Sequence, residues 1–171
     1  TEDLHPTDRT QMDDRYGTLR APVMLVGGLA ATADSFEVLT GMALGLQKKG
    51  LQPLVISRQP LGKLFRFHSL NHIFNSRDGA EADRILGLNT FLQDLERRYL
   101  PDLILMEAPD PVMRYNNIAP NGFGIRTYML CQAAPPDYLL CCVPCDLAVG
   151  NFLEMLSDDF SHRLPAKIIH D

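Results

Sequence analysis

The segment from Gly28 to Ser35 has the length and several residue types of a phosphate-binding loop. Such a loop reads Gly-x-x-x-x-Gly-Lys-Ser/Thr between a strand and a helix. Its backbone amides cradle phosphates, its lysine contacts the terminal phosphates and its hydroxyl holds Mg²⁺. The first glycine, the spacing and the hydroxyl of Ser35 fit this pattern, whereas Ala33 replaces the second glycine and Asp34 replaces the lysine. Aspartate repels phosphate, and it also suits the N-cap of the helix that follows.

The missing lysine decides which ligand chemistry this loop predicts. Without the positive charge that stabilises a transferring phosphate, the loop is not expected to hydrolyse a nucleotide in the usual way. We instead predict an atypical anion or nucleotide site here, with ATP or GTP and Mg²⁺ as the candidate ligands and a simple helix cap as the alternative. A basic loop at residues 58–79 could supply substitute charge through Arg58, Lys63 or Arg66. The candidate binding residues in the glycine segment are Gly27, Gly28, Thr32, Asp34 and Ser35.

A short apolar run at residues 103–106 ends in the carboxylate of Glu107. Ligands of parallel α/β folds sit beyond the carboxyl ends of the strands, where nucleotide-binding domains keep an acid that is linked to Mg²⁺. The run resembles the strand of dethiobiotin-synthetase-like enzymes, which also ends in glutamate. We therefore predict Glu107 as a Mg²⁺ ligand with Asp110 and Ser35 nearby. The alternative is a strand that simply exits into solvent.

Asparagines and glycines flank the loop that follows this strand. Asn116 and Asn117 could bond the polar edge of a ligand, and Gly122 and Gly124 before a helix could expose backbone amides to an anion. The alternative is ordinary turn chemistry, for which Asn, Gly and Pro are the usual residues. We keep Asn116 and Asn117 as candidate binding residues.

Cys142 and Cys145 have the Cys-x-x-Cys spacing of redox and zinc sites. A zinc site needs two further ligands, which Cys131, His162 or His170 would have to supply from elsewhere in the chain. Buried, unreactive cysteines in an apolar strand are the alternative. The i, i+4 spacing of two histidines at 68 and 72 would place them on one helix face, but the residues between them do not favour a helix, so no site is predicted there.

The composition is that of a folded domain and excludes some partners. The chain has 171 residues, 46% of them hydrophobic, and a formal net charge of −5. A basic face of the kind that binds nucleic acid is not evident. No apolar run approaches the roughly 20 residues that cross a bilayer, and the polar, acidic first residues do not read as a secretory signal. We therefore expect no nucleic-acid or membrane partner, and a reducing, cytoplasmic location.

Strand and helix patterns alternate along the chain. Residues 1–20 are polar without a hydrophobic period and predict an arm or an interdomain linker, while residues 21–171 predict one α/β domain. Alternating elements imply a mainly parallel sheet of about five strands between two helical layers, a three-layer αβα sandwich. Together with the segment from Gly28 to Ser35, the alternating pattern predicts a P-loop NTPase-like fold with a degenerate phosphate-binding loop. Strands are predicted at residues 22–26, 54–57, 103–107, 138–143 and 167–169, and helices at 34–49, 81–99, 124–133 and 152–160.

Several short runs together resemble the peptide maturation system proteins, which accompany ribosomally made, bacteriocin-like peptides in bacterial gene cassettes. The resemblance covers residues 22–170. The runs are Phe-His-Ser at 67–69, Pro-Asp-Leu-Ile-Leu at 101–105, Met-Arg-Tyr-Asn-Asn at 113–117, Phe-Gly-Ile at 123–125, Cys-Gln-Ala at 131–133 and Pro-Asp-Tyr at 136–138. The resemblance implies three partners: a precursor peptide, a radical SAM maturase and an acyl-carrier-like protein. It also implies a further N-terminal domain upstream, which agrees with a chain that starts at Thr1, and it supplies no catalytic residue.

Three functional hypotheses follow. The first is an accessory protein for peptide maturation, whose P-loop-like domain binds a partner, a peptide or an atypical nucleotide. The second is an active ATP- or GTP-dependent enzyme of the ligase or kinase type that acts on a peptide. The third is a thiol or zinc protein that uses Cys142 and Cys145.

Overall fold

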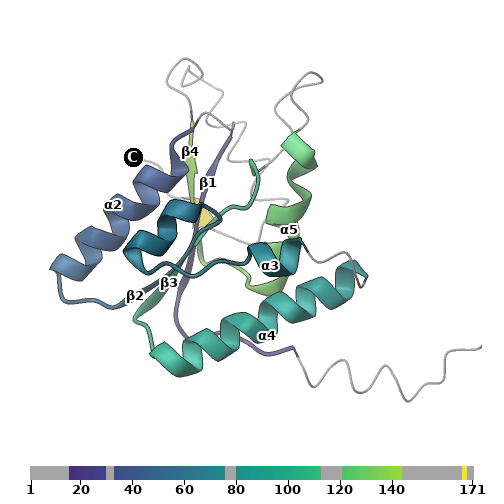
Figure 1. Ribbon diagram of the computed structural model, residues 1–171, viewed down its shortest axis with the longest axis horizontal. Helices are drawn as coiled ribbons and strands as arrows, with labels where there is room; N and C mark the ends of the chain where they lie inside the picture. Colours follow the sequence, from purple (N-terminus) through teal and green to yellow (C-terminus); the bar gives the residue numbers. More distant parts are fainter. Residues whose placement is uncertain (1–15, 30–32, 76–79, 113–120, 144–166, 169–171) are drawn as a thin grey trace, which may run out of the picture.

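The computed structural model describes residues 16–29, 33–75, 80–112, 121–143 and 167–168 (Figure 1). The predicted helix at 152–160 lies outside these ranges. The strands are β1 (Val23–Gly28), β2 (Pro53–Ile56), β3 (Leu103–Glu107), β4 (Tyr138–Cys142) and β5 (Lys167–Ile168). The helices are α2 (Ser35–Lys48), α3 (Asn71–Phe74), α4 (Glu81–Tyr99) and α5 (Ile125–Ala133), with 3₁₀ turns η1 (Pro60–Phe65) and η2 (Asn121–Gly124).

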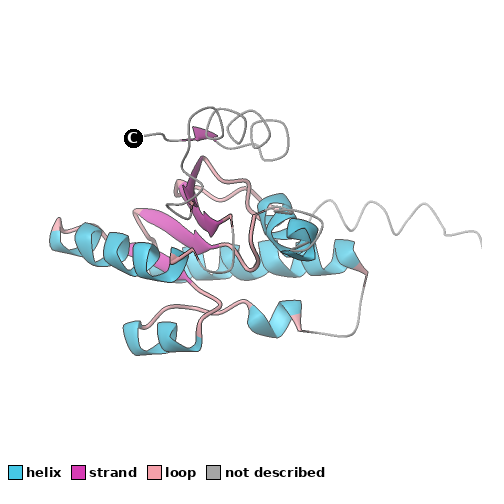
Figure 2. Cartoon of the chain, turned by 90° about the horizontal axis from the view of Figure 1, so that it is seen from above, coloured by secondary structure: helices cyan, strands magenta, loops and turns pink. Residues whose placement is uncertain are grey.

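The strands form a single sheet in the order β2-β3-β1-β4-β5, and every neighbouring pair is parallel. All strands therefore end at one edge of the sheet, which Figure 2 views from above. The α/β class with a parallel sheet is thus confirmed. A fully parallel sheet must be covered on both faces, which explains why the strand sequences are nearly continuous apolar runs.

Alternate residues of the strands enter two separate cores. Leu25, Ile104 and Met106 pack with Leu88 and Leu92 of α4 in the first core. The second core lies on the opposite face and joins strand residues to buried residues of α2; its members are Val26, Leu39, Ala43, Val55, Phe67 and Leu105. Helices therefore cover both faces of the sheet, with α2 on one and α4 and α5 on the other.

The predicted elements agree closely with those found. The helix predicted at 81–99 coincides with α4, where Pro101 follows the last turn, and the helix at 34–49 differs from α2 by one residue at each end. Residues 58–79, predicted as irregular, contain η1 and the short α3. His68 forms a parallel bridge with Ile56 of β2, whereas His72 lies in α3, so the two histidines do not share a helix face. Among the described residues, no helix has the length and apolar character that crossing a membrane requires.

The last residues of the predicted polar arm are tied to α4. The side chain of Asn89, which is 1% exposed, accepts a bond from the Gly17 amide (2.9 Å) and donates to the Gly17 carbonyl (2.8 Å). Glu96 accepts hydrogen bonds from the amides of Arg20 and Ala21, both 2.7 Å long. Residues 16–20 therefore pack along the domain, and residues 1–15 lie outside the described ranges.

The connection after β3 crosses directly over the end of β1. The Val112 amide donates to the Gly28 carbonyl (3.1 Å), and the Ala108 amide donates to the Val26 carbonyl (2.8 Å). A Cβ atom at Gly27 would lie 2.5 Å from Cγ1 of Val112 and 2.9 Å from Cβ of Ala108. Gly27 is therefore required for close packing of the sheet against this connection.

This contact predicts that Gly27→Ala destabilises the fold. Because the stiff Val112 side chain must move, we expect the free energy of unfolding to fall by about 1–3 kcal/mol. Urea unfolding followed by circular dichroism measures the change. The matched control is Gly41→Ala in α2, where an added Cβ meets nothing within 4 Å. That variant should be more stable by about 0.5–1 kcal/mol. Equal stability of Gly27→Ala and wild type would contradict the prediction.

Candidate functional site

The glycine segment begins inside the sheet and not in an open loop. Gly27 and Gly28 are buried residues of β1, and the ladder continues one residue further because the Leu29 amide donates to the Cys142 carbonyl (3.0 Å). The Gly28 carbonyl is already occupied by the Val112 amide. Thr32 lies outside the described residues.

Asp34 occupies the N-cap position of α2, as predicted, but its side chain makes no capping hydrogen bond. The residue is exposed, and Ser35 follows it as the first, half-buried residue of the helix. Burial raises the pKa of the Cys142 thiol, and the negative charge of Asp34 raises this pKa further. The Asp34 carboxylate therefore projects negative charge toward the end of β4, which opposes phosphate binding at this helix N-terminus.

Glu107 is turned inward at the end of β3. The residue is 3% exposed, so the alternative of a strand end in solvent is wrong. Its Oε2 atom accepts hydrogen bonds from Oγ of Ser57 (2.5 Å) and from the Arg58 amide (3.2 Å), and Ser57 Oγ accepts from the Gln59 amide (3.0 Å). Hydrogen bonds of this kind are what a buried carboxylate needs. The carboxylate joins the ends of β2 and β3.

Asp110 faces a different neighbour. Its Oδ2 atom lies 3.8 Å from Nε of Arg126, and its carbonyl accepts a hydrogen bond from Oγ1 of Thr127 (2.8 Å). Within the described ranges, no three His, Cys, Asp or Glu side chains come together as potential metal ligands. Mg²⁺ binding by Glu107 therefore stays a prediction without a second described ligand.

Two adjoining cavities open at the carboxyl edge of the sheet, on the face that carries α4 and α5. They measure about 330 and 480 Å³ and share Phe74 and Arg126. The first is polar on most of its walls. We call this region the carboxyl-edge cleft and define it by Arg58, Gln59, Asn71, Phe74, Asn75, Pro109 and Arg126.

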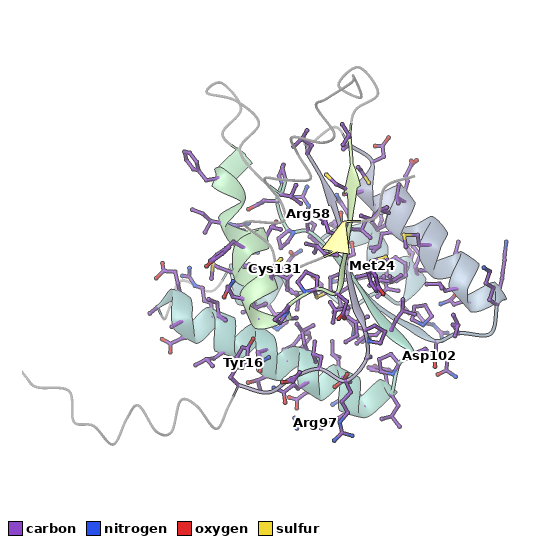
Figure 3. The ribbon with its side chains drawn as sticks, turned by 180° about the vertical axis from the view of Figure 1, so that it is seen from behind. Tyr16, Met24, Arg58, Arg97, Asp102 and Cys131 are labelled. Carbon is purple, nitrogen blue, oxygen red and sulfur yellow. The ribbon has the colours of Figure 1, made fainter. Side chains whose placement is uncertain are left out.

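Two arginines line the first cavity, Arg58 and Arg126, and Arg126 also pairs with Asp110 of the second cavity, which Glu81 and Arg84 line as well. Arg58 follows β2, and Figure 3 shows it toward the end of the sheet where the strands finish. Its carbonyl accepts a hydrogen bond from Nδ2 of Asn71 (2.9 Å), which ties the segment after β2 to α3. Arg126 stands in the first turn of α5, with half of its side chain exposed. Guanidinium groups with neighbouring amide side chains suit phosphate or carboxylate oxygens.

The cleft contains one of the three basic residues that were expected to supply charge. Arg58 lines it, whereas Lys63 and Arg66 line neither of its cavities. Sequence reasoning missed Arg126 and Asn71. The signal for Arg126 was its place two residues after Gly124, a glycine that sequence reasoning considered only for its backbone amide. Gly122 and Gly124 have left-handed φ values, 58° and 67°. Asn116 and Asn117 lie outside the described residues.

The described cysteines are free thiols without acidic character. Burial raises the pKa of Cys131 to about 12, and burial together with the neighbouring Cys142 raises the pKa of Cys141 to about 12. A reactive cysteine needs a lowered pKa, because the thiolate is the nucleophile and the metal ligand. Cys145 lies outside the described ranges, so its pairing with Cys142 is untested.

The position of Glu107 predicts a stabilising role that depends on its oxygen atoms. Glu107→Ala leaves the Ser57 hydroxyl and the Arg58 amide without their acceptor, so we expect the free energy of unfolding to fall by about 1–3 kcal/mol. Glu107→Gln keeps an acceptor oxygen and should lose less. The control is Glu37→Ala, at an exposed residue of α2. If Mg²⁺ raises the melting temperature of wild type but not of Glu107→Gln, metal ligation replaces this account.

The raised pKa of Cys131 predicts a pH-dependent contribution to stability. Its folded-state pKa of about 12 exceeds the ordinary value of 9.0, so the contribution is complete below pH 9.0 and is lost as the pH rises toward 12. Cys131→Ala lacks this titration. The difference in unfolding free energy between wild type and Cys131→Ala should therefore narrow above pH 9.0, as measured by urea unfolding at several pH values. A constant difference would show that the thiol does not titrate in this way.

Comparisons with known proteins leave the site to be interpreted from its own geometry. A scan against protein-family models and a search of curated proteins found no match to this chain. Three features make up the carboxyl edge. A glycine segment leads to Asp34 at the N-cap of α2, the buried Glu107 carboxylate accepts a hydrogen bond from Ser57, and a cleft is lined by Arg58 and Arg126.

Proposed function

We propose that this chain is an accessory protein for the maturation of a ribosomally synthesised peptide. In this proposal it is a P-loop-like αβα domain that has lost hydrolytic activity and acts in the cytoplasm. The carboxyl-edge cleft holds the phosphate groups of a nucleotide without turning it over. The precursor peptide, a radical SAM maturase and an acyl-carrier-like protein are its proposed partners.

The observation that supports the nucleotide part of this proposal is that positive charge lies in the carboxyl-edge cleft and not at the glycine segment, whereas the peptide-maturation part rests on the resemblance of the short sequence runs within residues 22–170. The position of the usual lysine is Asp34, while Arg58 and Arg126 line a polar cavity beyond the ends of β2 and β3. Adjacent strands β1 and β3 are followed by helices on opposite faces, α2 and α5. Ligands of open parallel sheets bind in the crevice outside such a switch point. Here Ala108 and Val112 pack on β1 itself, so the open volume lies beside it.

The same arrangement argues against an active ligase or kinase. Phosphoryl transfer needs positive charge on the γ-phosphate and a positioned metal ion. Asp34 places a negative charge where the positive charge for the γ-phosphate would be needed. Glu107 is the predicted metal ligand, but its Oε2 atom already accepts hydrogen bonds from Ser57 and from the Arg58 amide. For the thiol alternative, burial raises the pKa of Cys142 as well, so among the described residues this cysteine does not have the lowered pKa of a reactive thiol.

Isothermal titration calorimetry with ATP and GTP tests the proposed ligand. We expect binding that does not require Mg²⁺ and no release of inorganic phosphate. Arg58→Ala and Arg126→Ala should each weaken binding by about tenfold, because each removes a charge-assisted hydrogen-bond donor. The matched control is Arg97→Ala, at an exposed residue near the far end of α4 that pairs with Asp94 (Figure 3).

Two results would contradict the proposal. Phosphate release that depends on Mg²⁺ and on Glu107 would establish an active enzyme. If the Arg58→Ala variant bound nucleotide with the affinity of wild type, the carboxyl-edge cleft would not be the nucleotide site. Co-expression of this protein with the precursor peptide and its maturase tests the role in peptide maturation. We expect modified peptide to be lost when this protein is left out.

A further inference from the structure

Strand β2 forms one edge of the sheet, and part of its backbone is directed away from the other strands. The Asp102 amide donates to the Gln52 carbonyl (3.1 Å), so residue 52 and the alternate residues after it point toward β3. The intervening residues point outward: the Val55 carbonyl accepts from the His68 amide, and the Ser57 amide donates to the His68 carbonyl (both 2.9 Å). By the same alternation the Pro53 carbonyl and the Val55 amide face outward.

Among the residues that the structure describes, the chain pairs with this edge through one bridge. His68 runs parallel to β2 opposite Ile56, and the next pairing would need Arg66. Arg66 instead has a left-handed backbone, with φ 60° and ψ 29°, and its amide donates to the Lys63 carbonyl (3.1 Å). A non-glycine residue adopts this conformation at a cost. The ladder stops there, and within the described ranges no backbone group pairs with the Pro53 carbonyl or the Val55 amide, in a stretch where Val55 is 4% exposed.

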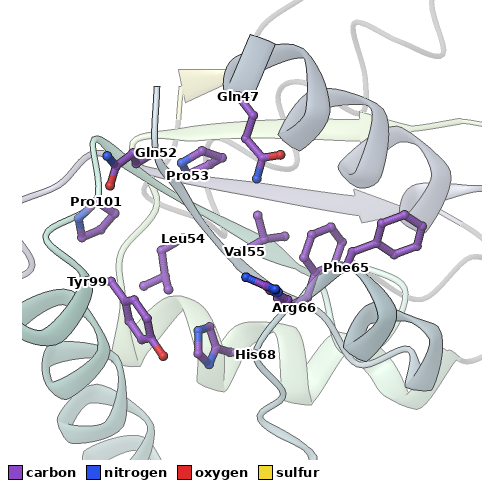
Figure 4. Close-up of a pocket in the computed structure, with 11 residues that line it drawn as sticks. Gln47, Gln52, Pro53, Leu54, Val55, Phe65, Arg66, His68, Tyr99 and Pro101 are labelled. Atoms are coloured by element: carbon purple, nitrogen blue, oxygen red, sulfur yellow. The ribbon is translucent and has the colours of Figure 1, made fainter. Parts of the chain in front are cut away.

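A groove of about 220 Å³ runs along this stretch. Figure 4 shows Gln47 reaching in from α2 on one side and His68 and Tyr99 on the other, with the Arg66 side chain between them. Rings of His68 and Tyr99 pack with centroids 4.9 Å apart, which fixes that wall. We define the edge groove by Gln47, Pro53, Val55, Arg66, His68 and Tyr99.

The charge in the edge groove is positive. Arg66 lines it, no aspartate or glutamate does, and Arg66 has no ion pair within the part of the chain that the structure describes. Burial lowers the pKa of His68, and the nearby Arg98 lowers it further, so this imidazole is neutral at pH 7 and adds no charge to the groove. An unpaired guanidinium in a groove suits a carboxylate, which it can hold with two parallel hydrogen bonds.

We propose that the edge groove binds an extended acidic peptide, which adds a short strand to β2. The peptide backbone pairs with the Pro53 carbonyl and the Val55 amide, and one carboxylate of the peptide pairs with Arg66. This is recognition by strand addition, in which main-chain bonds give affinity and alternate side chains give specificity. The groove has walls on both faces of the sheet, as alternating side chains of an extended peptide require. The inference concerns a different surface from the carboxyl-edge cleft and does not depend on nucleotide binding there.

The experiment uses fluorescein-labelled ten-residue peptide pools, randomised except for one central position that is fixed as Glu or as Lys. Fluorescence anisotropy measures their affinity for the full chain. We expect the Glu pool to bind at least about tenfold more tightly than the Lys pool. Arg66→Gly should abolish this preference. Glycine accepts the left-handed backbone at residue 66, so this variant removes the guanidinium without adding strain.

Further arms separate the alternatives. Methylation of the backbone nitrogens of the Glu pool should weaken its binding to the chain. The Arg58→Ala variant should bind the unmethylated Glu pool with the same affinity as wild type. Equal affinity of the Glu and Lys pools, or of wild type and Arg66→Gly, would overturn the proposal. Competition by glutarate at the same concentration as the peptide would show a small-carboxylate site instead. Because nucleotide binding is tested through Arg58, failure at one surface does not imply failure at the other.

Discussion

The contact between Gly27 and the connection after β3 is the constraint on which the carboxyl edge depends. The absence of a Cβ at Gly27 lets Val112 and Ala108 pack against the central strand, and the Val112 amide then bonds the Gly28 carbonyl. A chain segment therefore fills the place where a parallel α/β fold usually receives its ligand. The accessible volume moves outward to the carboxyl-edge cleft, between α3, α5 and the end of β2.

Glu107 provides the second constraint, because it fixes the segment that leaves β2. Its carboxylate bonds Ser57 and the Arg58 amide across a separation of about fifty residues in the chain. Burial makes these bonds costly to lose, so the backbone at Arg58 is held in one position. The side chain of Arg58 can then be presented to the cleft without an ordering cost for its backbone.

The secondary structure could be predicted from the sequence because its signals are local. The helical period and a following Pro101 determine the bounds of α4, and apolar runs between turn residues mark β2 and β3. The environment of Glu107 could not be predicted, since it depends on Ser57 from another strand and on strand order. For the same reason Arg126 and Asn71 were missed: their common cleft exists only once α3 and α5 pack on the same face.

Net charge is a poor guide to what this protein can bind. The chain carries a formal charge of −5, yet arginine lines both the carboxyl-edge cleft and the edge groove. Screening limits the reach of a surface charge to about 8–10 Å in physiological salt, so local arginines outweigh distant carboxylates. Arg58 and Arg66 belong to one connection, which hydrogen bonds hold at Glu107 and again at the bridge of His68 with β2. Since each point is fixed to the sheet by its own hydrogen bonds, we expect changes at one arginine to act independently of the other.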